Sequence, residues 1–249
     1  MHVEGTENTD EKVLSPEMRF LTFPDTSCEL RQSLQTRKRE YCAGTILKVE
    51  AEENTATYCI LSGWLALSKS TIDGERQIID VILPGEILHP TSADGHSSWI
   101  QIETLSRASL AVVPRAEWSK LEAADPTIRQ LEATTIAASL SRMSERMLRL
   151  GKGTAESRIA YALIELCLRL TAIGQSKNRE YHLPMTQKDL GDFVGLSSVH
   201  VCRTLRRLNR NGVISTMDHM DIRIHDVETL AHIAEVDLDR LQSEIISVR

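Results

Sequence analysis

Residues 44–114 alternate between short hydrophobic or β-branched runs and turn residues. An apolar run at 58–61 is followed by Ser62-Gly63, and a second run occupies 64–67. Asp73-Gly74 is a dipeptide typical of a hairpin tip. Many short strands at such close spacing predict a β-roll or a barrel in this part of the chain.

The pattern then changes, and Ala, Glu, Leu, Ser and Met become frequent. Because no Gly or Pro lies between Pro126 and Gly151, a helix of about 24 residues is allowed there. Its apolar residues follow the 3-4 spacing of a coiled-coil seam: Ala133, Ile136, Leu140, Met143, Met147 and Leu150. We predict a dimerisation helix, with Ile128 and Leu131 off the seam and packed on the β domain. Periodicity alone fits an internal helix equally well, but Gly151-Lys152-Gly153 indicates a hinge into a new domain and favours dimerisation.

Residues 156–170 carry apolar side chains on one face, with Ser157, Arg158 and Arg169 placed elsewhere. This pattern predicts an amphipathic helix that covers a second core. A polar loop follows, and we expect residues 181–184 to form a short strand.

The segment from Thr186 to Leu208 predicts a helix-turn-helix. Thr186 is a suitable N-cap for the first helix, Gly195 allows the backbone of a tight turn, and Ser197 caps the second helix. The apolar side chains of the second helix share one stripe, which leaves the opposite face to contact a partner. We expect residues 214–224 to form a two-stranded wing.

In a helix-turn-helix, the N-terminal end of the second helix reaches base edges in the major groove. Four residues of its outward face are expected to contact bases: Ser198, Val199, Cys202 and Arg203. Arg203 can bind both acceptors of a guanine with its planar fork. Phosphate contacts are expected from Thr186, Gln187, Lys188, His200, Arg206 and Arg207. The alternative is a helical hairpin that only packs, with its arginines forming a solvated charged face.

Charge is spread unevenly along the 249 residues, whose net charge is −6. Residues 151–225 hold 11 Lys and Arg against 7 Asp and Glu, so the basic segment is the one that carries the motif.

No stretch approaches the roughly 18 unbroken apolar residues of a membrane span, and the N-terminus lacks a signal sequence. We expect a cytoplasmic protein without membrane attachment. Its five scattered cysteines predict no disulfide framework.

The chain from about Glu29 to Asp226 resembles the CRP/FNR family of bacterial transcription regulators, in its FNR/FixK-like branch of alphaproteobacterial type. The segments that carry the resemblance are 60–64, 77–86 and 183–190, and residues 199–201 resemble the alphaproteobacterial variant. The family implies an α+β fold: an N-terminal cyclic-nucleotide-binding-like β-roll, a long dimerisation helix and a C-terminal winged helix-turn-helix. It implies a homodimer on double-stranded DNA that reads two half-sites of an inverted repeat, with RNA polymerase as a partner. Activation is the expected role, and repression remains open at this point.

Departures from the family pattern bear on the effector. Members that bind cyclic AMP hold its phosphate with an Arg-Ser/Thr pair, but no arginine lies between Arg76 and Arg107. Cys28 and Cys42 are too sparse for the N-terminal cluster of oxygen-sensing members. We therefore predict neither ligand, no metal site and no resident cofactor. An unidentified small molecule in the β-roll and control by abundance remain open.

Three further hypotheses concern single residues. Cys202, between two expected base-reading residues, is either a redox switch or a small residue that fits the groove. His89 and His96 could belong to a metal-dependent β-roll enzyme, although their spacing is poor for it. A haem- or metal-binding sensor is the other alternative, with one histidine as an axial ligand.

These patterns divide the chain into five expected segments. They are a flexible tail at 1–27, the β-roll domain at 28–116, the dimerisation helix at 117–151, the winged helix-turn-helix at 152–226 and a helical tail at 227–249.

Overall fold

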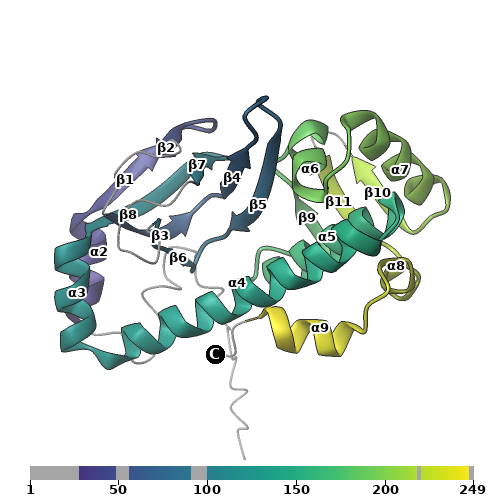
Figure 1. Cartoon of the computed structure of the whole chain (residues 1–249). Helices are drawn as coiled ribbons and strands as arrows, with labels where there is room; N and C mark the ends of the chain where they lie inside the picture. Colours follow the sequence, from purple (N-terminus) through teal and green to yellow (C-terminus); the bar gives the residue numbers. More distant parts are fainter. Residues whose placement is uncertain (1–27, 49–55, 91–99, 218–219, 247–249) are drawn as a thin grey trace, which may run out of the picture.

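The computed structural model describes residues 28–48, 56–90, 100–217 and 220–246. A domain of β-strands is followed by one long helix and by a mostly helical domain with a small sheet (Figure 1). This arrangement confirms the α+β fold expected from the sequence. The expected N-terminal tail, the wing tip Asp218-His219 and His96 lie outside the described residues.

The N-terminal domain consists of two four-stranded antiparallel sheets, ordered β1-β8-β3-β6 and β2-β7-β4-β5. The strands are β1 (Lys38–Tyr41), β2 (Ile46–Lys48), β3 (Ala56–Ser62), β4 (Leu65–Ser70), β5 (Arg76–Ile82), β6 (Ile87–Leu88), β7 (Gln101–Thr104) and β8 (Ala108–Pro114). Ile60, Leu65, Ile102 and Leu110 fill the core that both sheets share. The β4–β5 hairpin turns at Gly74 with φ 85°, as its sequence predicts.

Helices α2 (Cys28–Thr36) and α3 (Arg115–Ala124) pack against one side of this domain together with the start of α4 (Pro126–Lys152). Ile128 is buried in this second core, so the first turns of α4 pack on the β domain as expected. The long helix begins at Pro126, as the pattern predicts, and the first part of the segment expected at 117–151 belongs to the separate helix α3. The residue before a proline avoids the helical region, and Asp125 is extended at φ −133° and ends α3.

The long helix α4 has two contrasting faces. Its exposed face carries Ile136, Leu140 and Met147, which are 63%, 62% and 70% exposed. Three buried arginines, Arg142, Arg146 and Arg149, lie on its other side. The helix continues through Gly151 and ends at Lys152 with Gly153 as its C-cap, within the segment Gly151-Lys152-Gly153 where the sequence indicates a hinge.

The C-terminal domain begins with α5 (Ala155–Ala172), which is buried on nearly all sides. The remaining elements are β9 (Glu180–His182), α6 (Gln187–Val194), α7 (Ser198–Arg210), β10 (Ile214–Met217), β11 (Asp221–Ile224), α8 (Val227–Ala234) and α9 (Leu238–Ile245). The sequence places Ser157 and Arg169 off the apolar face, yet both are buried. The amphipathic expectation for α5 is therefore wrong, because the β domain and α4 enclose its polar side as well.

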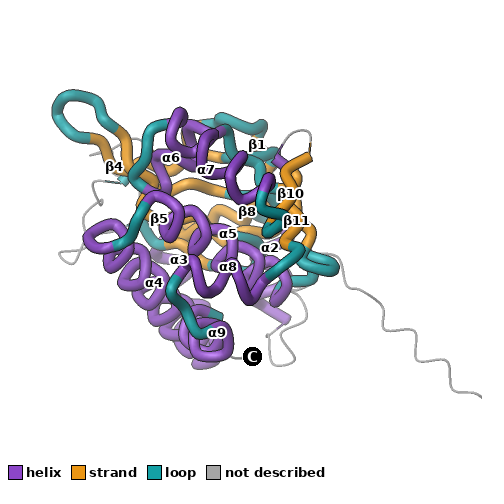
Figure 2. Tube along the Cα trace, turned by 90° about the vertical axis from the view of Figure 1, so that its right-hand side faces the viewer, coloured by secondary structure: helices purple, strands orange, loops and turns teal. Residues whose placement is uncertain are grey.

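The helical tail consists of α8, which packs on α5, and α9, which packs on α4 (Figure 2). Leu230, Leu241 and Ile245 join the large core of the C-terminal domain. No helix among the described residues is both long enough and apolar enough to cross a membrane.

Candidate nucleic-acid interface

The helix-turn-helix consists of α6, a tight turn and α7, as the sequence predicts. Thr186 and Asp189 form a reciprocal capping box: the Thr186 hydroxyl accepts from the Asp189 amide at 3.1 Å, and the Asp189 carboxylate accepts from the Thr186 amide at 3.0 Å. Gly195 ends α6 in the left-handed region at φ 66°. Ser197 caps α7 by accepting from the His200 amide. All three predicted local signals are confirmed.

Helix α7 is anchored by one face and exposed on the other. Val201, Leu205 and Leu208 are buried, as the stripe in the sequence predicts. The expected base-contact residues Ser198, Val199 and Arg203 are exposed, and Cys202 is half-buried. Figure 1 shows α7 at the outer edge of the C-terminal domain, away from the β-strand domain.

The exposed arginines of α7 differ in their partners. Arg203, Arg206 and Arg210 form no ion pair with any described residue. Arg207 instead donates from Nε to Glu156 Oε1 of α5 at 3.0 Å. An arginine held by a carboxylate has less freedom to bind a phosphate, which sets Arg207 apart from its neighbours.

The remaining expected phosphate residues lie at the start of α6 and beside the turn. Lys188 pairs with Asp192 at 2.9 Å, and Gln187 is exposed. The Nδ1 atom of His200 lies 3.0 Å from the Ser197 hydroxyl. The capping box uses both the hydroxyl and the backbone amide of Thr186, so neither group of this residue is free for a phosphate.

The β-strand domain contacts the helix-turn-helix directly, a contact that no pattern in the sequence predicts. Arg76 at the start of β5 pairs with Glu103 of β7 and, at 3.1 Å, with Asp189 of α6. Gln77 Nε2 donates to the carbonyl oxygen of Phe193 at 3.2 Å. Burial raises the pKa of Asp189, but hydrogen bonds from Thr186 and the charge of Arg76 outweigh this and lower it. The helix α6 is therefore docked on the β4–β5 hairpin.

The wing is present as β10 paired with β11, with Ile214 opposite Ile224. Its strand β11 also pairs with β9, so the wing belongs to a three-stranded sheet. Arg223 of the wing is held by Glu180 of β9 through Nε at 2.8 Å.

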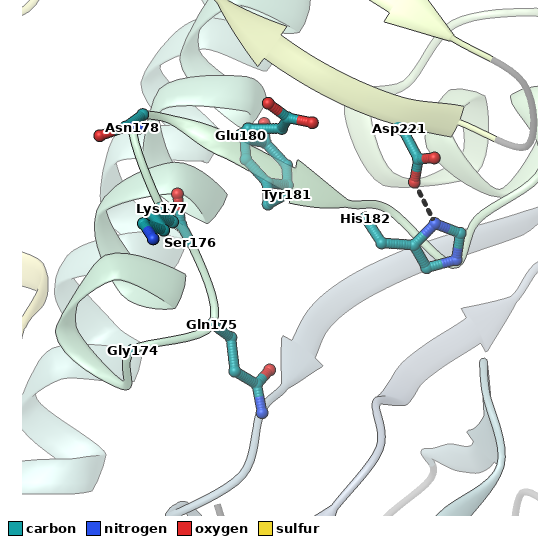
Figure 3. Close-up of a pocket in the computed structure, with 9 residues that line it drawn as sticks. All are labelled: Gly174, Gln175, Ser176, Lys177, Asn178, Glu180, Tyr181, His182 and Asp221. Carbon is teal, nitrogen blue, oxygen red and sulfur yellow. Dashed lines mark hydrogen bonds and ion pairs between the residues drawn. The ribbon is translucent and has the colours of Figure 1, made fainter. Parts of the chain in front are cut away.

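A hollow of about 550 Å³ opens beside this sheet, lined by Gly174, Gln175, Ser176, Lys177, Asn178, Glu180, Tyr181, His182 and Asp221 (Figure 3). Its two carboxylates are already paired, Glu180 with Arg223 and Asp221 with His182 at 2.7 Å. The hydroxyl of Tyr181 donates to the carbonyl oxygen of Leu163 at 2.8 Å. These pairings occupy the two carboxylates, the histidine and the tyrosine hydroxyl of the hollow.

Glu86, in the Gly85-Glu86 segment of the β-roll, is bound from several sides. Its carboxylate accepts from the Leu83 amide at 2.8 Å and from Arg169 at 2.8 Å, and it pairs with Arg142 at 3.1 Å. The acidic residue of this segment is therefore occupied by groups of the chain itself.

His89 belongs to a cluster of hydrogen bonds rather than to a metal site. Its Nε2 pairs with Glu132, its Nδ1 lies 2.9 Å from the Thr57 hydroxyl, and Trp118 Nε1 donates to Glu132 at 2.7 Å. Within the described part of the chain, no three His, Cys, Asp or Glu side chains gather in a way that could hold a metal ion.

The cysteines occupy different environments. Cys59 and Cys167 are buried, and burial raises the pKa of both thiols above the usual value. A buried thiol with a raised pKa has little thiolate character and is therefore little reactive. Cys42 is exposed, and Cys202 is partly accessible on α7.

The residues expected at a dimer seam do not all behave alike. Ile136, Leu140 and Met147 are exposed, whereas Met143 and Leu150 are half-buried. A Cβ atom added at Gly195 would lie 2.6 Å from Cδ2 of Leu150, so Leu150 lies against the turn of the helix-turn-helix. Leu148 is also exposed beside the seam, although the predicted seam does not include it.

The chain is similar to known proteins in both of its domains. Residues 157–233 match the family described as Crp-like helix-turn-helix domain, and residues 38–125 match the family described as cyclic nucleotide-binding domain. The nitrogen fixation regulation protein FixK of Azorhizobium caulinodans is 30% identical over 173 residues, which cover 70% of this chain and 69% of that protein. The transcriptional activator protein FnrA of Stutzerimonas stutzeri is 28% identical over 203 residues, which cover 82% of each chain.

Solved structures share the fold. The structure of FixK2 from Bradyrhizobium japonicum matches with a TM-score of 0.71 and 24% identity, over 80% of this chain and 98% of that chain. The relatives in sequence are transcription regulators and not enzymes, which excludes the enzyme alternative for this chain. The two matched domains, in this order and joined by α4, place the chain in the CRP/FNR family of DNA-binding transcription regulators, in its FixK-like branch.

Proposed function

We propose that two copies of this chain bind an inverted repeat in double-stranded DNA, each placing α7 in the major groove of one half-site. The observation that carries this proposal is the outward face of α7, where Arg203 and Arg206 form no ion pair with any described residue while the opposite face is buried. Unpaired arginines at the exposed end of a capped helix suit contact with guanine edges and phosphates.

Base contacts are assigned to the first two turns of α7. Arg203 binds a guanine through its fork, Val199 contacts a thymine methyl group, and Ser198 and Cys202 complete the reading set. Arg206 and His200 bind phosphates, together with Gln187 and Lys188 at the start of α6. Arg207 contributes to phosphate binding only after it is released from Glu156.

The exposed apolar stripe of α4 supports dimerisation. A soluble domain gains little from exposing Ile136, Leu140 and Met147 at i, i+4 and i+11 of one helix, unless a second copy covers them. Two α4 helices packed in parallel along this stripe would place the two α7 helices on one side of the dimer. This symmetry matches two half-sites about one helical turn apart.

Control by cyclic AMP is not part of the proposal. No arginine lies between Arg76 and Arg107 to hold a cyclic phosphate, and Glu86 is bound by Arg142 and Arg169. Named relatives are transcriptional activators, which supports activation through RNA polymerase in the cytoplasm as the role of this chain.

Selection of bound sequences from a random DNA pool tests this function. The wild-type protein is compared with Arg203→Ala and with Arg240→Ala, which removes an exposed arginine on α9, at two salt concentrations. We expect a two-fold inverted repeat from the wild type and from Arg240→Ala, and loss of its enrichment with Arg203→Ala. Salt-sensitive binding without any enriched sequence would contradict the proposal and leave only a generic basic face.

A further inference from the structure

Six charged side chains meet where the β domain, α4 and α5 come together. Three are acids and three are arginines, and we call them the junction cluster: Asp80, Glu86, Arg142, Arg146, Glu165 and Arg169. All except the partly exposed Glu86 are buried. Buried charges in proteins are paired, and these six are equal in number of each sign and in contact with one another.

Asp80 of β5 is the centre of this cluster. Arg142 Nη2 donates to its Oδ2 at 3.1 Å, and Arg146 Nη2 donates to its Oδ1 at 2.7 Å. Arg146 also donates from Nη1 to the carbonyl oxygen of Ile79 at 3.0 Å. Two arginines one helical turn apart on α4 thus hold one strand of the β-roll at fixed points.

Arg169 ties α5 of the C-terminal domain to the same part of the β-roll. Its Nη2 donates to the carbonyl oxygen of Val81 at 2.6 Å and to Glu86 at 2.8 Å. Its Nη1 donates to Glu165 of the same helix at 3.2 Å. The dimerisation helix and the first helix of the DNA-binding domain are therefore fastened to adjacent residues of one strand.

The contacts continue from this cluster to the helix-turn-helix. The guanidinium of Arg146 lies over the ring of Phe193 in α6, 4.7 Å from its centroid. Arg158 of α5 donates to the carbonyl oxygen of Leu150 at 2.9 Å and to that of Gly195 at 3.3 Å. The end of α4 is thereby joined to the turn that precedes α7.

The ion pairs of the junction cluster fix the orientation of the elements that they join, and they contribute little net free energy of folding. Burial alone would raise the pKa of Asp80, but the charges of Arg142, Arg146 and Arg169 hold it well below its usual range. Desolvation offsets much of the attraction in buried ion pairs, and apolar replacements of such groups are often as stable. Forked, multiply bonded arginines do, however, fix the relative orientation of the elements that they join.

We propose that the junction cluster sets the angle at which α6 and α7 leave the dimerisation helix, and so sets the half-site spacing that the dimer accepts. Asp80, Arg142 and Arg146 are positioning residues for DNA binding, since they lie away from the exposed face of α7. This proposal rests on the proposed function, a dimer on two half-sites. The junction cluster determines which distance between half-sites the dimer prefers, and α7 determines which bases it recognises.

The test uses the full-length protein and duplexes that carry the half-sites selected by the wild type. The spacing between half-sites is native or changed by one or two base pairs, and one duplex carries a single half-site. Asp80→Asn is compared with the wild type and with Arg240→Gln as a control that loses an exposed ion pair. We expect Asp80→Asn to lose about tenfold in affinity at the native spacing and to bind the other spacings almost equally well.

Affinity for the single half-site should stay unchanged in Asp80→Asn, because its α7 face is intact. Arg142→Lys keeps the charge but not the fork between Asp80 and Glu86, and it should change the spacing preference in the same way. This variant decides the matter if Asp80→Asn does not fold. A variant with a lower melting temperature but the wild-type ratio between spacings overturns the proposal. Wild-type protein that binds the repeat no better than the single half-site would instead overturn the proposed function.

Discussion

Arginines on α4 and arginines on α7 stand in opposite environments. Arg142 and Arg146 are buried and bound by Asp80, whereas Arg203 and Arg206 are exposed and form no ion pair within the described residues. The first pair is used inside the protein to hold elements together, and the second remains available to an external anion. Arginines that pair with a carboxylate of the same chain therefore orient its elements. Arginines without such a partner remain available to bind DNA.

The largest expected effect of this difference concerns stability. Arg146→Ala leaves Asp80 and Glu165 short of a partner in a buried site, which should lower the free energy of unfolding by about 3–5 kcal/mol. Arg206→Ala removes an exposed side chain and should change it by no more than about 0.5 kcal/mol. Urea denaturation of both variants and the wild type at the same protein concentration measures this contrast. Equal losses in the two variants would show that the α7 arginines also support the fold.

The acid sensitivity of the fold sharpens the same comparison. The folded pKa of Asp80 lies below its unfolded value of about 3.9, so its contribution to stability is present above that pH. As pH falls below about 4, the unfolded chain takes up a proton that folded Asp80 resists, and stability decreases. In Asp80→Asn the side chain at position 80 does not titrate in either the folded or the unfolded state. The melting temperature of this variant should therefore fall less than that of the wild type between pH 5 and pH 3. Parallel curves for the two proteins would contradict an ionised, arginine-bound Asp80.

Salt dependence distinguishes the arginines within α7. Each phosphate contact contributes about 0.9 to the slope of log affinity against log salt, so Arg206→Ala should reduce the slope of the dimer by about two. Arg207→Ala should reduce it less, because Glu156 already binds that side chain. Titrations of a selected operator at four salt concentrations measure both slopes. An equal reduction would mean that the Arg207–Glu156 pair opens on DNA.

The sequence predicts most of the local structure around the DNA-binding face. Thr186, Gly195 and Ser197 act through neighbours within four residues, so their roles as caps and turn follow from short-range rules. The exposed stripe and the buried stripe of α7 follow from helical periodicity in the same way. These features are local, and local features can be predicted from a single sequence.

The junction of the domains was not predictable by the same rules. Arg142 and Arg146 recur at helical spacing, but an arginine on a helix is ordinarily solvated, and no signal near them in the sequence identifies Asp80 as their partner. The contact between Arg76 and Asp189 spans 113 positions. Arg169 was assigned to a polar face for the same reason, although the β domain covers it. Long-range ion pairs leave no periodic signal in either of the segments that they join.

The smallest expected effect concerns Cys202, which lies on the recognition face between Val199 and Arg203. Oxidation to a sulfenic acid would add an oxygen atom at a position where the DNA must approach closely. The redox hypothesis predicts that peroxide lowers the affinity of the wild type for its operator and leaves Cys202→Ser unchanged. Fluorescence anisotropy with a selected operator, before and after peroxide and again after a thiol reductant, measures this effect.

Cys42 supplies the matched control, because it is exposed on the β domain, away from α7. Cys42→Ser should respond to peroxide as the wild type does, and reductant should restore binding in both. Equal responses of wild type and Cys202→Ser would support the other hypothesis, in which Cys202 is a small residue that fits the groove. In that case Cys202 would contribute only its small size to the exposed face of α7, and the contacts with DNA would depend on Ser198, Val199 and the exposed arginines.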